Sequence, residues 1–229
     1  MTETDRDGAG EPAAVAVRQL DPADLRAAAR LHADALSEGF LAQLGPGFLR
    51  RYLDTFRTTP GAVALAAQAP DGAFAGFVVG STCLGHNRQA LQLHWRSLLP
   101  AAALALGLRP RVLWQFLRTR AARYGRVALI TARGRRGGGP PARRATTTGG
   151  PVVTAVLLHV AVEVAGRGNG AGSALVEAST ARARAAGCTR ARLMSFGETD
   201  AFYTRLGWTP VSARTDDDGR RAVLYGLDL

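Results

Sequence analysis

The sequence predicts an α/β fold, and three observations support this prediction. The first is a series of short elements over residues 15–80, in the order strand, helix, helix, strand, strand. The second is a long apolar strand, Val152–Val162, of the kind buried on both faces of a sheet, that leads through a glycine-rich turn into a helix. The third is a closing series of strand, short helix and two strands. Elements in such an order are typical of a sheet covered by helices.

The first half of the chain has clear start and turn signals. Asp21 fits the N-cap position of a helix, and Pro22 fits its first turn. Pro70-Asp-Gly72 is a strong hairpin signal between two apolar runs. The predicted elements here are a strand at 15–20, helices at 21–36 and 46–56 separated by a turn at 38–41, and strands at 63–67 and 74–80.

The second half is expected to alternate in the same way. A helix over Ser173–Ala186 ends at Gly187, a residue type common just after helix ends. The acidic turn Asp216-Asp-Asp-Gly219 separates the last two strands and is most simply a solvated hairpin tip, although it would also attract a cationic acceptor. The other predicted elements are strands at 189–196, 208–213 and 221–227 and a helix at 199–206.

Two segments lie outside this series. Residues 1–13 show no apolar period and are predicted to be a disordered tail. Arg88–Arg126 is predicted to be helical with a break at Gly107–Pro110, and Arg133–Pro151 is rich in Gly, Pro and Thr, as flexible loops are. We therefore expect one domain at 14–229, with an inserted helical segment and flexible loop at about 86–150.

The net charge of +11 is concentrated in this insertion. The chain contains no lysine, and 13 of its 29 arginines lie within 86–151, whereas all 18 acidic residues lie outside 72–162. Aromatic residues are too few, and the arginines too mixed with alanine and leucine, to indicate a nucleic-acid-binding surface. We do not expect nucleic acid as a partner.

Composition also excludes several other classes of protein. The two cysteines, Cys83 and Cys188, form no disulfide framework, and no Cys/His spacing suits zinc, so no metal is expected. The polar, acidic N-terminus is unlike a signal peptide, and the longest apolar run, Leu98–Leu106, is too short to span a bilayer. We expect a cytoplasmic protein without a membrane partner.

The glycine-rich turn at 166–172 predicts a phosphate site. Unpaired amides at a helix N-terminus bind anions, and Gly168, Gly170 and Gly172 have no Cβ that would hold a pyrophosphate off the backbone. The spacing fails the G-x-G-x-x-G dinucleotide pattern, because Ser173 stands at the third position. A Walker loop needs lysine, which this chain lacks.

The pattern that matches is Arg167-x-x-Gly170-x-Gly172. It resembles the [Q/R]-x-x-G-x-[G/A] signature of the GNAT superfamily of acetyl-CoA-dependent N-acetyltransferases. Ala201-Phe-Tyr-Thr-Arg-Leu-Gly-Trp208 resembles the F-Y-x-x-x-G-[F/W] segment of the same superfamily. The element order from Val15 to Leu229 also resembles that of GNAT proteins.

This resemblance implies a fold and an activity. The fold would be a mixed, mostly antiparallel central sheet with a splayed parallel strand pair flanked by helices. The activity would be transfer of an acetyl group from acetyl-CoA to a primary amine, most simply of a small molecule, by direct attack in a ternary complex. No metal is implied. The neighbouring alternatives are an acyltransferase that uses a longer acyl-CoA or an acyl carrier protein, and a CoA-binding domain without turnover.

The resemblance also assigns roles to residues. Backbone at Val160, Ala161 and Val162 would pair with the pantetheine arm like an added strand. The pyrophosphate would bind the loop of Arg167, Gly168, Asn169, Gly170, Ala171, Gly172 and Ser173. Tyr203 would be the general acid that protonates the departing thiolate.

The general base stays open. GNAT enzymes often carry a glutamate at the position of Val156, where this chain departs from the pattern. His159 is the only titratable side chain on that strand, but a strand period of 2 puts it on the opposite face from Val156 unless a bulge intervenes. Glu38 in the turn between the first helices is a second candidate, and release of the proton to water is a third possibility.

The role of the insertion stays open as well. In GNAT proteins acceptors enter at the edge where it begins. It would be a lid over the acceptor, a homodimer surface formed by its apolar stripe, or a docking surface for an acidic partner. We favour the lid or the dimer surface.

Overall fold

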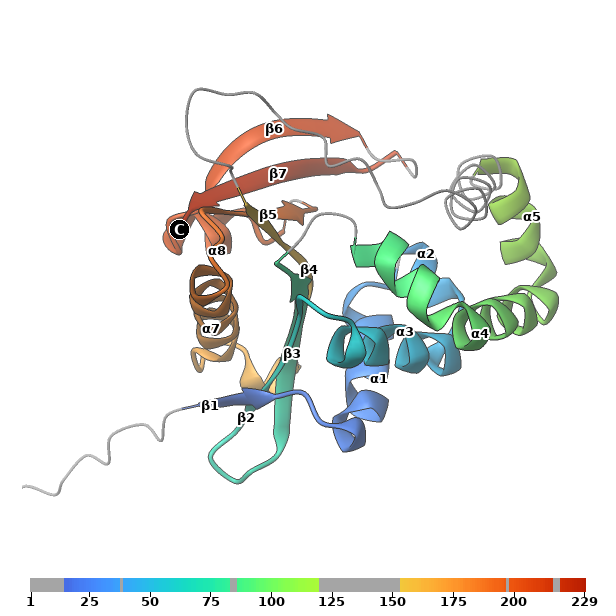
Figure 1. The fold of residues 1–229 in the computed structure, drawn as a ribbon, viewed down its shortest axis with the longest axis horizontal. Helices are drawn as coiled ribbons and strands as arrows, with labels where there is room; N and C mark the ends of the chain where they lie inside the picture. Colours follow the sequence, from blue (N-terminus) through green and yellow to red (C-terminus); the bar gives the residue numbers. More distant parts are fainter. Residues whose placement is uncertain (1–14, 38, 83–85, 120–152, 197, 216–218) are drawn as a thin grey trace, which may run out of the picture.

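The computed structural model describes residues 15–37, 39–82, 86–119, 153–196, 198–215 and 219–229. The predicted disordered tail, the predicted flexible loop at 133–151 and Glu38 therefore lie outside the described residues. Where the chain is described, it forms a curved sheet with helices on both faces (Figure 1).

The sheet has seven strands in the order β1-β2-β3-β4-β5-β7-β6. Only β4 and β5 pair in parallel, and all other neighbours are antiparallel. The mixed, mostly antiparallel sheet is thus confirmed. The strands are β1 (Ala16–Gln19), β2 (Ala62–Gln68), β3 (Phe74–Ser81), β4 (Thr154–Val162), β5 (Arg190–Ser195), β6 (Thr209–Thr215) and β7 (Arg221–Asp228).

The helices form two layers. In Figure 1, α7 and α8 lie on one side of the sheet, whereas α1 and α3 lie on the other. Helices α4 and α5 lie beyond α1 and α3, farther from the sheet. The helices are η1 (Pro22–Asp24), α1 (Leu25–Ala35), α2 (Phe40–Gln43), α3 (Pro46–Thr58), α4 (His86–Gly107), α5 (Pro110–Thr119), η2 (Val164–Gly166), α7 (Ala171–Ala185) and α8 (Asp200–Arg205).

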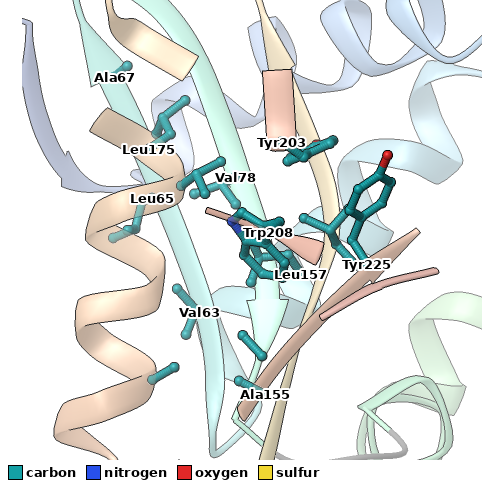
Figure 2. Close-up of a cluster of buried hydrophobic side chains, with 14 of the residues drawn as sticks. Val63, Leu65, Ala67, Val78, Ala155, Leu157, Leu175, Tyr203, Trp208 and Tyr225 are labelled. Atoms are coloured by element: carbon teal, nitrogen blue, oxygen red, sulfur yellow. The ribbon is translucent and has the colours of Figure 1, made fainter. Parts of the chain in front are cut away.

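Each layer buries its own apolar core against the sheet. The core on the α7 side includes Leu175, Trp208 and Leu157 (Figure 2). The core on the α1/α3 side includes Leu49, Phe56 and Phe77, all at most 2% exposed. Because the central strands contribute to both cores, they are fixed between two packed layers.

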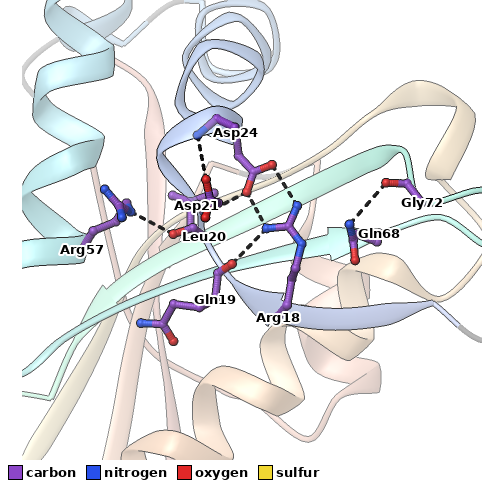
Figure 3. Close-up of polar contacts among 9 residues, drawn as sticks. Arg18, Gln19, Leu20, Asp21, Asp24, Arg57, Gln68 and Gly72 are labelled. Carbon is purple, nitrogen blue, oxygen red and sulfur yellow. Dashed lines mark hydrogen bonds and ion pairs between the residues drawn. The ribbon is translucent and has the colours of Figure 1, made fainter.

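The corner between β1 and α1 is held by polar contacts (Figure 3). Asp21 is the predicted N-cap: its side chain accepts the Ala23 amide, and Asp24 accepts the Asp21 amide at 2.8 Å, which completes a capping box. Arg18 donates two hydrogen bonds to Asp24, at 2.6 and 2.9 Å. The paired Arg18 guanidinium is the largest cause that lowers the pKa of Asp24.

The structure corrects three details of the sequence prediction. The predicted turn at 38–41 is wrong in part, because a short helix, α2, begins at Phe40. The strand ending at Val162 is not buried on both faces throughout, because residues 158–160 are half-buried. Helix α7 begins at Ala171, two residues earlier than predicted. The predicted break at Gly107–Pro110 is confirmed by the end of α4 and the start of α5.

Candidate functional site

The two parallel strands separate half-way along β4. They pair in register from Thr154 with Arg190 to Leu157 with Leu193, and no pairing is recorded beyond that point. On its other edge β4 stays paired with β3 as far as Val162. Within the described part of the chain, residues 158–162 therefore have one backbone edge without a strand partner, as the splayed parallel pair predicts.

A bulge in β4 lies at the point of separation. Val79 of β3 pairs with His159, and the next residue, Gly80, pairs with Leu157, so Leu158 is the extra residue. An extra residue shifts every later side chain to the opposite face of a strand. Leu157 accordingly packs in the core on the α7 side, whereas His159 faces α1 and α3. The bulge therefore places His159 on the same face as Val156.

His159 is held by contacts from both helices that cover its face. Its Nε2 atom is 3.3 Å from the Tyr52 hydroxyl of α3, and its ring centroid is 4.6 Å from that of His32 of α1. His32 is 1% exposed, and neither of its ring nitrogens has a hydrogen-bond partner among the described residues. The sequence analysis did not identify His32 or Tyr52, because only the packing of α1 and α3 on β4 brings them to His159.

Burial keeps both imidazoles neutral. Desolvation lowers the pKa of His32 to about 4. Desolvation, followed by the proximity of His32, lowers the pKa of His159 to about 3. A neutral His159 has one unprotonated ring nitrogen, but its low pKa makes it a weak base.

The loop after β4 presents a run of unpaired backbone amides. The amides of residues 168–173 donate no hydrogen bond within the part of the chain that is described, and the first bond of α7 runs from Ala174 to Gly170. Gly168 and Gly170 have φ values of 82° and 81°, which only glycine adopts without strain. These amides lie at the positive end of the 15-residue helix α7. The geometry is that of an anion site.

The structure gives Gly172 a second role besides the one that the motif suggests. A Cβ at Gly168 or Gly170 would meet nothing within 4 Å, whereas a Cβ at Gly172 would lie 3.3 Å from the Phe202 ring. Gly172 thus allows α8 to pack against the start of α7. Its role in close helix packing is additional to the predicted approach of a phosphate.

A groove of about 630 Å³ runs beside this loop. It lies between the loop and the β2–β3 hairpin, and its lining includes Asp71, Phe74, Gly166, Gly168 and Asn169. The groove gives a ligand held by the loop amides room on the protein surface.

Tyr203 lies on the other side of the sheet from His159. It is 8% exposed and contacts Phe202, Trp208 and Tyr225, with ring centroids 5.0, 6.3 and 6.1 Å away. Its burial raises the pKa of the phenol to about 12, so it is protonated at neutral pH. Tyr203 and His159 therefore lie on opposite faces of the sheet, on either side of the opening between β4 and β5.

Part of the chain is similar in sequence to a known family of enzymes. The Acetyltransferase (GNAT) family model matches residues 131–208, the part of the chain that holds β4, the amide loop and α8. Over these residues the chain is similar to GNAT acetyltransferases. A search of curated proteins finds no match.

Solved GNAT structures share the fold. Ard1 from Thermoplasma volcanium is 18% identical, with 94% of this chain and 98% of that chain covered and a TM-score of 0.53. A GNAT-family protein from Desulfovibrio desulfuricans is 16% identical over 94% and 99% of the two chains, also at 0.53. An aminoglycoside 6'-N-acetyltransferase complexed with coenzyme A is 11% identical over 93% and 96%, again at 0.53. At these identities the likeness concerns the GNAT fold.

Two further searches of the described residues were negative. They contain no group of three or more His, Cys, Asp or Glu side chains that could hold a metal ion. Within the same residues, no helix is long and apolar enough to cross a bilayer.

Proposed function

We propose that this protein is an acetyl-CoA-dependent N-acetyltransferase that acetylates a primary amine in a ternary complex. The observation that carries the proposal is the run of unpaired amides at residues 168–173 beside the unpaired edge of β4. A pyrophosphate and an extended pantetheine arm need those two features side by side.

The donor would occupy the site in two parts. The loop from Arg167 to Ser173 would hold the pyrophosphate through its amides. The backbone of Val160, Ala161 and Val162 would pair with the pantetheine arm, because the bulge leaves this edge free of β5. The thioester would then lie in the opening between the two strands.

The chemistry would use side chains from both faces. The amine nitrogen attacks the thioester carbonyl carbon, the carbon–sulfur bond breaks, and the thiolate takes the proton of Tyr203. The amine loses its own proton to His159, Glu38 or water. A base as weak as His159 suits the protonated nitrogen of the tetrahedral adduct better than a free alkylammonium, because the adduct is the stronger acid.

Calorimetric titration of the protein with coenzyme A and acetyl-CoA tests the donor. We expect both to bind, and ADP to bind more weakly because it lacks the pantetheine arm. Butyryl-CoA and octanoyl-CoA in the same titration separate an acetyltransferase from an enzyme for longer acyl groups. Absence of binding by coenzyme A and acetyl-CoA would contradict the proposal.

Turnover is tested separately by thiol release from acetyl-CoA against a panel of amines. Release that depends on the added amine, with a stoichiometric acetylated product by mass spectrometry, is the expected result. CoA binding without release for any amine would instead indicate a binding domain.

A further inference from the structure

An arginine lies on the α1/α3 side of the sheet beside the point where β4 and β5 separate. Arg192 of β5 pairs in register with Val156 of β4. Its neighbours Ala191 and Leu193 are buried in the core on the α7 side, so alternation directs Arg192 to the opposite face. That is the face on which the bulge places His159.

Arg192 lacks a counter-ion in the described structure. Its Nε atom is buried and has no hydrogen-bond partner there, and none of the ion pairs among the described residues includes it. A guanidinium N–H that is removed from water without an acceptor is costly. An anionic ligand would supply the missing acceptor.

The surrounding strands add positive charge. Met194, the next residue on this face, is contacted by Nη2 of Arg214 at 3.7 Å. Asp228 is the only acidic residue in the seven described strands, and it is paired with Arg190 at 2.8 Å. Residues 120–152 contain no acidic residue that could neutralise these arginines.

Within the described strands, the charge beside the opening is therefore positive.

We propose that Arg192, assisted by Arg214, binds a carboxylate of the acceptor, and that the acceptor is a small amine bearing a carboxylate. The inference rests on the proposed acetyl transfer, in which the amine reacts as described above and the carboxylate stays unchanged. A polycation would be repelled by two arginines without acidic partners, whereas an amino acid would be attracted by them.

The spacing indicates a short acceptor. Val156, the register partner of Arg192, and His159 pair with residues two positions apart on β3, because of the bulge between them, which is about 7 Å along a strand. A guanidinium reaches several ångströms from its backbone, so a chain of a few methylene groups would connect the carboxylate to the reacting amine.

The test compares acceptors that differ only in the charge of one end. The ω-amino acids from glycine to 6-aminohexanoate are each matched with the diamine of the same number of carbon atoms where one exists. Binding is measured by calorimetry with coenzyme A present, and acetylation by thiol release. We expect at least one amino acid to bind and react tenfold or more better than its diamine.

Variants then test whether Arg192 causes the preference for amino acids over diamines. Arg192→Gln should remove the preference by weakening amino-acid binding about tenfold or more, whereas Arg192→Lys, which keeps the charge, should retain part of it. Arg190→Gln is the matched control, because Arg190 lies on the same strand but is already paired with Asp228, and it should leave the preference unchanged. Circular dichroism checks that each variant is folded.

Three outcomes overturn the inference: diamines preferred at every length, no amino acid bound at any length, or a preference unchanged in Arg192→Gln. The same titrations separate it from the proposed function. Coenzyme A binding with preferred diamines rejects only the anion site. Amino-acid binding that needs Arg192, in a protein that does not bind coenzyme A, rejects only the proposed function.

Discussion

Tyr203 combines a protic group with a largely apolar environment. Three aromatic rings surround it, and its burial raises the pKa to about 12, so the phenol keeps its proton until a stronger base forms next to it. A raised pKa also makes the phenol a weaker acid, so a departing thiolate takes its proton only if desolvation raises the proton affinity of the thiolate by a comparable amount. Burial therefore holds Tyr203 in the protonated form that the proposed acid needs.

At this scale we predict the effect of Tyr203→Phe. The substitution removes only the hydroxyl, so the turnover number should fall by roughly 10²-fold while coenzyme A affinity and thermal stability change little. Tyr225→Phe is the matched control, since Tyr225 lies 6.1 Å away in the same core and should keep full turnover. Steady-state kinetics on both variants decide; an equal loss in both would mean that the hydroxyl of Tyr203 is not the acid.

At the scale of elements, the bulge in β4 and the N-terminus of α7 shape the site. The bulge ends the pairing with β5 and turns His159 toward α1 and α3. The left-handed Gly168 and Gly170 then turn the chain so that the first amides of α7 point outward. The glycine turn is local in sequence, whereas the bulge depends on the pairing with β3, and the proposed donor site needs both.

Gly170→Ala tests the second feature. A Cβ there meets no atom within 4 Å, but the φ of 81° costs an L-residue about 1 kcal/mol, so the free energy of unfolding should fall by about that amount and coenzyme A binding should weaken. Gly47→Ala is the control: Gly47 is the second residue of α3, with nothing within 4 Å of a Cβ, and alanine should raise stability by at most about 0.5 kcal/mol. Urea denaturation measures both, and a Gly170→Ala protein as stable as the wild type would contradict the strain argument.

At the scale of the whole molecule, the sheet is packed between two helical layers, and the His32–His159 pair lies between the sheet and the α1/α3 layer. Both imidazoles are neutral in the folded protein and regain an ordinary pKa near 6.5 on unfolding. The unfolded chain therefore binds more protons below pH 6.5. The stability that these residues contribute is complete above pH 6.5 and is lost as the pH falls.

We predict that mild acid lowers the free energy of unfolding of the protein. With a folded pKa of about 4, His32 alone should lower the free energy of unfolding by about 2 kcal/mol between pH 7.5 and pH 5. His32→Phe, of similar volume at a site 1% exposed, should remove that part of the pH dependence. Urea denaturation of both proteins at the two pH values provides the measurement, and equal losses of stability on acidification would show that His32 is not responsible.

The sequence by itself determined the elements and the loop proposed to bind the donor. Apolar periodicity, the Asp21 cap and the Pro70–Gly72 turn are local signals, so they predicted the elements closely, and the spacing of Gly168, Gly170 and Gly172 predicted the unpaired amides. Within the described residues, the short helices α2 and η2 and the exact start of α7 were missed, because one helical turn has too little periodicity to be recognised.

The tertiary structure decided which side chains share the acceptor face. The strand period alone left the face of His159 dependent on a bulge, and the pairing with β3 places that bulge at Leu158. Tyr52, His32 and Arg192 come from separate elements and are brought to this face by helix packing and strand register, which are set by long-range contacts. The sequence determined the site proposed for the donor, whereas the face proposed for the amine exists only in the folded sheet.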